Sequence, residues 1–227
     1  KIAMCRNLMM LFAAAATTTT VLRRSSRAVA LVAAPTTCVR RHRLLTQRRA
    51  EASDTAAPKF PFSAMDIRVG QFVSAREHPD SEKLFIEDID VGEEEPLQIV
   101  SGLRAYYELA DLENQRCLVV ANLPKAKLAG VDSYGMVLCG SEGEKTKVEF
   151  ILPPDDAEPG DRVVLLDEEE FPAPMTANQV KKKKVWPAIQ PMLAVKDGVA
   201  TYDGVALAAG ENRGPCKPST ILNGPIS

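Results

Sequence analysis

From Asp66 onward the chain alternates short apolar runs with Gly, Pro, Asn and Asp, and this pattern predicts β-strands joined by turns. The runs long enough to be strands are Ile67–Ala75, Leu84–Val91, Leu97–Val100, Arg116–Asn122, Gly135–Cys139, Val148–Leu152 and Arg162–Leu166. Between the third and fourth runs, Ala105–Asn114 carries Leu109 and Leu112 at helical spacing among acidic residues, which predicts a short exposed helix. Several short strands with one interposed helix are typical of a small closed β-barrel.

The composition of the chain changes at the acidic run Asp167–Glu170, which is followed by two closely spaced prolines. The tail that follows, residues 175–227, contains a run of four lysines and the only tryptophan, Trp186, which indicates a buried apolar contact. We therefore expect a β-domain over residues 66–168 and a small appended domain over residues 175–227.

The first 57 residues differ from the rest of the chain in charge. They carry ten Lys and Arg residues against two acids, a formal charge of +8, whereas the remaining residues carry eighteen basic and twenty-eight acidic side chains, a formal charge of −10. An Arg-rich, hydroxyl-rich and acid-poor leader is typical of an organellar transit peptide. Residues 58–65, which contain two prolines, are expected to form a linker.

Two alternatives for residues 1–57 stay open, a secretory signal built on the apolar run Leu8–Ala16 and a basic RNA-binding tail. This run is far shorter than the roughly 20 residues that a membrane-spanning helix needs, so no membrane insertion is expected. The Arg clusters continue to Arg49, beyond a plausible signal-peptidase site, and this favours the transit peptide. Because the chain begins with Lys1, we expect the initiator to be Met4 or a residue further upstream.

The sequence carries no pattern that predicts a catalytic centre, a metal site or a cofactor. Cys117, Cys139 and Cys216 are widely spaced and odd in number, which argues against a disulfide scaffold or a zinc knuckle, and the first two lie in apolar runs typical of a core. His78 is the single histidine after residue 57, and no nucleophile motif accompanies it, although a Ser/His/acid site stays open. We therefore expect a binding module and not an enzyme.

Five stretches, in order, resemble the tRNA-binding domain that is appended to, or associated with, aminoacyl-tRNA synthetases. They are Asp66-Ile67-Arg68-Val69-Gly70, His78-Pro79-Asp80 through Lys83-Leu84, Val100-Ser101-Gly102-Leu103, the segment NLPKAKLAGV from Asn122 to Val131, and Ser133-Tyr134-Gly135-Met136. The resemblance implies an all-β fold, a five-stranded OB-fold barrel with a small appended C-terminal domain. It also implies an accessory factor that presents tRNA to an aminoacyl-tRNA synthetase.

The tail extends this resemblance. The segment Asn178–Leu193 is similar to the second domain of the endothelial monocyte-activating polypeptide II branch, and it looks closest to the plant and algal organellar members. In that branch the extra domain covers the surface through which shorter relatives dimerise, so a monomer is implied. An organellar location is implied as well, with the plastid stroma favoured over the mitochondrial matrix.

A tRNA-binding surface needs cations that a rigid domain holds against the phosphates. The candidate contacts, taken with the resemblance, are Arg68, Arg76, Lys83, Ser101, Lys125, Lys127, Ser133, Met136, Lys181, Lys182, Lys183 and Lys184. Lys125 and Lys127 are separated by one residue, so both side chains point the same way if their loop, 124–130, is extended. Gly135 is expected to adopt a backbone conformation that other residues avoid, which would let a nucleotide approach.

Each of these assignments has a simpler interpretation. The basic residues could be ordinary solubilising surface, Met136 could fill a gap in the core, and Lys181–Lys184 could be a solvated face. Tyr106, Tyr107 and Tyr134 are the only tyrosines near the motifs, so we expect recognition to depend mainly on RNA shape and backbone.

The acidity of the chain after residue 57 works against long-range attraction to RNA. Two functions therefore stay open: a tRNA-binding cofactor, or a non-catalytic structural or protein-binding subunit of an organellar assembly that has lost tRNA affinity. Lys125, Lys127, Ser133 and Met136 favour the first function, and the formal charge of −10 favours the second.

Overall fold

The computed structural model describes residues 60–170 and 172–227, and these residues lie in one compact unit. The expected transit peptide, residues 1–57, lies outside the described residues, as does the start of the expected linker. Among the helices that the structure describes, none is long and apolar enough to cross a membrane.

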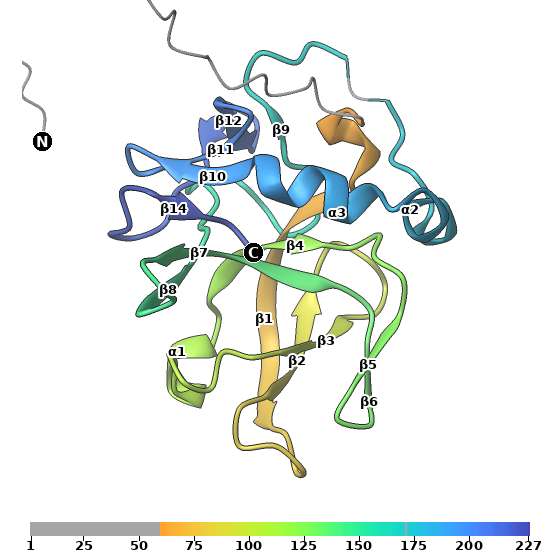
Figure 1. Ribbon diagram of the computed structural model, residues 1–227, viewed down its shortest axis with the longest axis vertical. Helices are drawn as coiled ribbons and strands as arrows, with labels where there is room; N and C mark the ends of the chain where they lie inside the picture. The colour runs from red at the N-terminus through yellow and green to blue at the C-terminus, as the bar shows by residue number, and fades with distance from the viewer. Residues whose placement is uncertain (1–59, 171) are drawn as a thin grey trace, which may run out of the picture. The chain divides into compact units, whose positions relative to one another are not determined.

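The first sheet has six strands in the order β3-β2-β1-β4-β7-β8, and neighbouring strands are antiparallel (Figure 1). These strands are β1 (Ile67–Glu77), β2 (Phe85–Asp90), β3 (Leu97–Ser101), β4 (Arg116–Val120), β7 (Met136–Glu142) and β8 (Lys147–Phe150). Each lies within a few residues of an apolar run that predicted it, so the predominantly β fold expected from the sequence is confirmed. The sheet has six strands where five were expected.

The central strands of this sheet are buried on both faces. In β4, Cys117 and Val119 face one apolar cluster, whereas Leu118 and Val120 face another. Successive residues of a strand point to opposite faces, so an uninterrupted apolar run of this kind requires apolar partners on both sides. The first cluster is built within the β-domain, and the second is completed by C-terminal residues.

The C-terminal residues form a second sheet in the order β13-β12-β11-β10-β14, and β9 pairs with β12. Its strands are β9 (Val164–Leu165), β10 (Leu193–Lys196), β11 (Val199–Tyr202), β12 (Val205–Ala209), β13 (Gly214–Pro215) and β14 (Gly224–Pro225). The helices α2 (Ala177–Lys183), α3 (Val185–Ile189) and η2 (Gln190–Met192) precede β10. The apolar run predicted over Arg162–Leu166 contributes to this second sheet through β9. Its first residues also contact the first sheet, because Arg162 forms an isolated bridge with Arg68 of β1 and the Val163 N–H donates to the Ile67 carbonyl.

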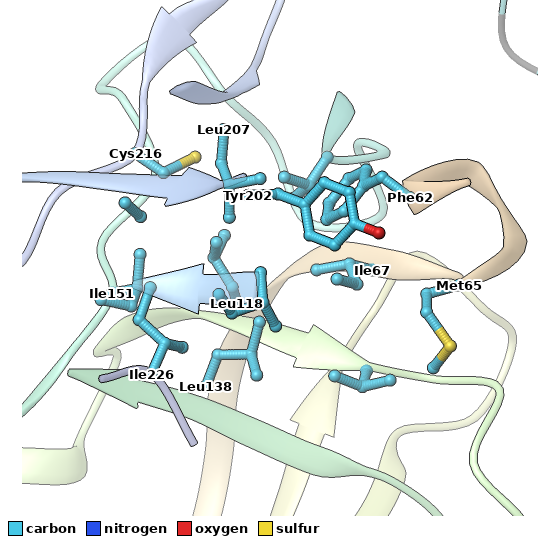
Figure 2. Packing of buried hydrophobic residues seen from close by; sticks show 14 of the residues in the cluster. Phe62, Met65, Ile67, Leu118, Leu138, Ile151, Tyr202, Leu207, Cys216 and Ile226 are labelled. Atoms are coloured by element: carbon cyan, nitrogen blue, oxygen red, sulfur yellow. The ribbon is translucent and has the colours of Figure 1, made fainter. Parts of the chain in front are cut away.

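One apolar cluster joins the two sheets. Figure 2 shows Ile67 and Leu118 of the first sheet packed toward Tyr202 and Leu207 of the second, and all four side chains are buried. Trp186 of α3 packs against the same cluster, which agrees with the apolar contact predicted for the tryptophan. The two sheets therefore share their main core.

Residues 60–65, expected to be part of a linker, are packed instead. The short 3-10 helix η1 spans Phe62–Ala64, and both Phe62 and Met65 are buried. The ring of Phe62 lies 5.4 Å from the ring of Tyr202, whose hydroxyl donates to the carbonyl of Phe60 at 3.0 Å. The aromatic residues of this segment thus contact Tyr202, which is distant in the sequence, so the composition of the segment alone could not predict the packing.

Two polar attachments also hold the C-terminal residues to the first sheet. The carboxylate of Glu149 in β8 accepts hydrogen bonds from the Thr220 backbone N–H at 2.7 Å and from the Thr220 hydroxyl at 2.6 Å. Burial opposes the ionisation of Glu149, but these bonds, with those from Lys147 and Ile221, lower its pKa to about 2. At the other attachment, Ser227 and Cys139 of β7 exchange two backbone hydrogen bonds, each of 2.9 Å.

The helix expected over Ala105–Asn114 is shorter than predicted. Helix α1 spans Leu109–Leu112, with Leu112 buried and Leu109 partly exposed. Tyr107, which precedes it, instead turns inward, and its ring stacks on Phe150 at 4.5 Å between centroids.

Cys117 and Cys139 lie in the core, as the sequence predicted. Both are free and buried, and so is Cys216, for which no such prediction was made. Among the described residues no cluster of His, Cys, Asp and Glu could hold a metal ion.

Candidate nucleic-acid interface

One face of the first sheet carries a connected set of basic and polar side chains. Ser74 and Arg76 of β1 lie on this face, and Ser74 pairs with Asp88 of β2. The Asp88 carboxylate accepts hydrogen bonds from the Ser74 hydroxyl at 2.7 Å and from Arg76 Nη1 at 3.1 Å. Arg76 Nη2 also donates to Gln98 Oε1 of β3 at 3.4 Å, so the network crosses three neighbouring strands.

Gln98 links this network to a hairpin beside β3. The hairpin consists of β5 (Ala126–Leu128) and β6 (Val131–Ser133), in a region where the sequence predicted only a loop (Figure 1). Gln98 Nε2 donates to the backbone carbonyl of Asp132 at 2.7 Å, and the Tyr134 N–H donates to the Gln98 carbonyl at 3.0 Å. The hairpin is therefore held against the edge of the first sheet.

Lys125 and Lys127 point to the same side of this hairpin, as the alternation of an extended segment predicts. Both approach one carboxylate: Lys125 Nζ lies 2.7 Å from Oδ2 of Asp132, and Lys127 Nζ lies 3.9 Å from Oδ1. The hydrogen bond between Lys125 and Asp132 raises the pKa of the lysine and lowers the pKa of the acid. The two lysine side chains are 54% and 67% exposed, so an RNA phosphate can reach both.

Ser133 occupies a different position from the one predicted for a tRNA contact. It is buried, and its Oγ accepts from the Val100 N–H at 3.0 Å and donates to the Gly135 carbonyl at 3.1 Å. The hydroxyl thus holds the hairpin against β3 and has no free donor to offer to RNA.

The conformation predicted for Gly135 was wrong, because its φ angle is not positive. The position requires glycine for space: a Cβ atom there would lie 2.8 Å from the carbonyl oxygen of Val120. The segment that follows β6 therefore passes very close to β4.

Ser101 and Met136 meet at a pocket of about 390 Å³, which Leu103, Tyr106 and Leu128 also line. Met136 is half-buried and packs against the core that the two sheets share, so it fills a gap in the core and also forms a wall of the pocket. The structure therefore brings together Ser101 and Met136, which the sequence analysis named as candidate tRNA contacts.

The other predicted contacts lie apart from the hairpin. Arg68 is held by two carboxylates, with Nη2 2.8 Å from Asp66 and Nη1 3.2 Å from Glu93, and the hydrogen bond to Asp66 raises its pKa. Lys83 is exposed in the turn between β1 and β2, and Lys181–Lys184 are exposed on α2 and at its C-terminal cap. No ion pair described in the structure joins these residues to the lysines of the hairpin.

The sequence analysis missed a buried carboxyl group beside Ser101. Glu87 of β2 is fully buried, and its Oε1 accepts a short hydrogen bond from the Ser101 hydroxyl, whereas Oε2 has no partner among the described residues. Burial raises the pKa of Glu87 to about 8, and the hydrogen bond from Ser101 opposes this rise. The alternation of Phe85, Glu87 and Ile89 places the acid on the apolar face of its strand, and this is the signal that could have revealed it.

Comparison with known proteins identifies the class to which this fold and surface belong. Residues 67–162 match the family model "Putative tRNA binding domain". The C-terminal domain of Plasmodium vivax p43, in its crystal structure, is 36% identical with a TM-score of 0.67, and the alignment covers 74% of this chain and 99% of that domain. The chain belongs to this family of tRNA-binding domains.

Two curated relatives show how such domains occur in longer proteins. The mouse aminoacyl tRNA synthase complex-interacting multifunctional protein 1 is 36% identical over 181 residues, which are 79% of this chain and 56% of the mouse protein. The tRNA-aminoacylation cofactor arc1 of Schizosaccharomyces pombe is 34% identical over 175 residues, which are 73% of this chain and 38% of arc1. The chain thus spans about half or less of the length of these two relatives.

Proposed function

We propose that this protein binds tRNA and acts as an accessory factor that presents tRNA to an aminoacyl-tRNA synthetase. The observation that carries the proposal is the surface that runs from Arg76 through Gln98 to Asp132, Lys125 and Lys127, in a domain of the tRNA-binding family. It presents one cation from the first sheet, Arg76, and two from the hairpin beside that sheet, Lys125 and Lys127. Cations held in this way neutralise phosphates and release the counterions condensed on the nucleic acid.

Asp132 acts in this proposal as a limit on RNA affinity. Its carboxylate lies between the two lysines and offsets part of their charge before any phosphate arrives. In the same way Asp88 offsets the charge of Arg76. Because these carboxylates offset the cations, and because the chain after residue 57 is acidic, we expect this surface to attract RNA only modestly at long range.

We expect the double substitution Lys125→Ala/Lys127→Ala to weaken tRNA binding and to reduce the slope of log affinity against log salt by about 1 to 2. Each phosphate contact contributes roughly 0.9 to this slope on a duplex. Because Asp132 neutralises part of the charge of both lysines, each lysine can contribute less than this value. The measurement is tRNA affinity over a salt series. Asp132→Asn should instead tighten binding at low salt, because it releases both lysines from their counter-charge.

The matched control is the double substitution Lys196→Ala/Lys217→Ala, which removes the same charge from exposed lysines of the C-terminal region and should leave the slope unchanged. The alternative function, a protein-binding subunit that has lost tRNA affinity, is favoured by the carboxylates beside each cation. Wild-type protein that shows no salt-dependent tRNA binding even at low ionic strength would rule out the tRNA proposal in favour of this alternative.

We also propose that the protein is a monomer. The C-terminal sheet and helices cover apolar residues such as Leu118 and Leu138 of the first sheet, which supports the idea that no second chain is needed to bury them. Light scattering of the purified full chain at micromolar concentration is expected to give a mass near 24.7 kDa. A concentration-independent dimer would contradict this proposal and leave the tRNA proposal standing.

A further inference from the structure

The pocket beside the hairpin has the size and lining of a small-molecule site. Its volume of about 390 Å³ falls within the roughly 300–1,000 Å³ typical of ligand pockets. Its walls are mostly apolar, with Leu103, Leu128, Met136 and Val148 among them, and the side chain of Tyr106 lies at its exposed edge. The Tyr106 hydroxyl donates to the carbonyl of Lys145 at 3.1 Å, which fixes the ring at this edge.

A polar pair, half-buried Ser101 and buried Glu87, lies at the wall of this pocket. Ser101 lines the pocket, and its hydroxyl donates to Glu87, which lies diagonally opposite on the neighbouring strand β2. Glu87 is fully buried, and its second carboxyl oxygen has no hydrogen-bond partner among the described residues. A buried polar atom without a partner is costly, and such atoms in native proteins call for an explanation.

The carboxyl group of Glu87 does not repel a ligand that carries negative charge, such as a nucleotide. Burial raises its pKa to about 8, so the group is mostly protonated at neutral pH and adds no negative charge to the pocket wall. The Ser101 hydroxyl donates its single proton to Glu87, so its oxygen still has a lone pair that can accept a hydrogen bond from a ligand in the pocket.

The position of the pocket relative to the lysines follows from the hairpin. Lys127 and Leu128 are consecutive residues of β5, and their side chains therefore point to opposite sides. Lys127 points toward Asp132, and Leu128 lines the pocket. One short strand thus separates a phosphate-binding cation from an apolar cavity that has a polar acceptor in its wall.

We propose that this pocket receives one unstacked nucleobase of a bound tRNA, with Ser101 accepting a hydrogen bond from the base and Tyr106 contacting its face. The inference rests on the tRNA-binding function proposed above and adds a base contact to it. Proteins commonly bind unpaired RNA bases by stacking them on aromatic rings and by hydrogen-bonding their edges. An N–H group of the base supplies the donor that the Ser101 oxygen can accept.

We expect Tyr106→Leu to reduce tRNA affinity about tenfold, because stacking of a base on an aromatic side chain is worth a factor of this order or more. Ser101→Ala should reduce affinity about three- to tenfold, and Ser101→Thr, which keeps the hydroxyl, should recover most of the loss. In all three variants the salt slope should equal that of wild type, because none of them removes a phosphate contact. Ser219→Ala, an exposed serine of the C-terminal region, is the matched control.

A second measurement reports on the pocket itself. In protein with labelled methionine methyl groups, saturating tRNA should shift the NMR resonance of Met136, which lines the pocket, and leave that of the buried Met65 in place. Four nucleoside monophosphates at millimolar concentration serve as isolated probes, and at least one should shift Met136 in wild type but less in Tyr106→Leu. This readout also identifies variants that have lost the fold.

The two proposals fail in different ways. If wild-type protein shows no salt-dependent tRNA binding, the tRNA function fails, and the base pocket fails with it. If tRNA binds with a slope that the two hairpin lysines control, while Tyr106→Leu and Ser101→Ala bind like wild type and the Met136 resonance stays unchanged, the base pocket is overturned and the tRNA function stands.

Discussion

Replacing Glu87 with glutamine is expected to raise the free energy of unfolding at pH 8 by about 4 kcal/mol and to leave it nearly unchanged at pH 4. The carboxyl has a pKa of about 8 in the folded protein, because it is buried, against 4.5 when it is solvated. Between these two values the folded state holds a proton that the unfolded state has released, so stability falls as the pH rises from 4.5 to 8. Glutamine has no proton to lose and removes this penalty.

Chemical denaturation at several pH values between 4 and 8.5 measures this effect. The wild-type protein should lose stability across the window, whereas the Glu87→Gln variant should show a flatter profile. Glu113→Gln is the matched control, because it changes an exposed carboxylate at the end of α1 and should leave the profile as it is. A Glu87→Gln variant that is less stable than wild type at pH 8 would show that the buried acid is ionised and paired in the folded protein.

The second large effect is expected at Gly224, where β14 passes the first sheet. A Cβ atom at this position would lie 2.0 Å from the backbone carbonyl oxygen of Ser141 in β7. Backbone cannot rotate out of the way as a side chain can, so Gly224→Ala must displace one strand from the other. We expect a loss of about 3 kcal/mol in the free energy of unfolding, at the upper end of what overpacking in a core usually costs.

Thermal unfolding of Gly224→Ala against Gly102→Ala separates crowding from the general effect of adding a methyl group. At Gly102 a Cβ atom would have no neighbour within 4 Å, and its φ angle is not positive, so the substitution should be nearly neutral. Equal stability of the two variants would show that Gly224 and Ser141 do not pack as closely as the structure indicates.

The strands of the first sheet could be predicted from the sequence because their apolar runs are local. The run Arg116–Asn122 predicted β4 (Arg116–Val120), whose residues are buried on both faces. Apart from β9, which lies in the predicted run Arg162–Leu166, the strands of the second sheet could not be predicted in the same way. They are short and rich in Gly, Ala and Pro, and their burial depends on partners such as Ile67 and Leu118 that are distant in the sequence.

The candidate site, too, could be predicted only in part from the sequence. The spacing of Lys125 and Lys127 predicted that both point the same way, and the hairpin confirms it. The spacing could not show that Asp132 lies between them, because this depends on the cross-strand register that pairs Lys127 with Asp132. Ser133 lies in a stretch that resembles the family and yet is buried, because its hydroxyl holds the hairpin against β3.

The pairing of β7 with the last residues of the chain has a consequence for synthesis. Cys139 and Gly140 of β7 pair with Ser227 and Ile226, which are synthesised more than eighty residues later. At a translation rate of roughly 5–20 residues per second, this edge of β7 stays unpaired on a nascent chain for about 4 to 17 seconds, while β8 pairs with the other edge. An open strand edge is a template for pairing with another chain. We therefore expect polypeptides stalled before residue 224 to be the form of this protein that depends most on chaperones.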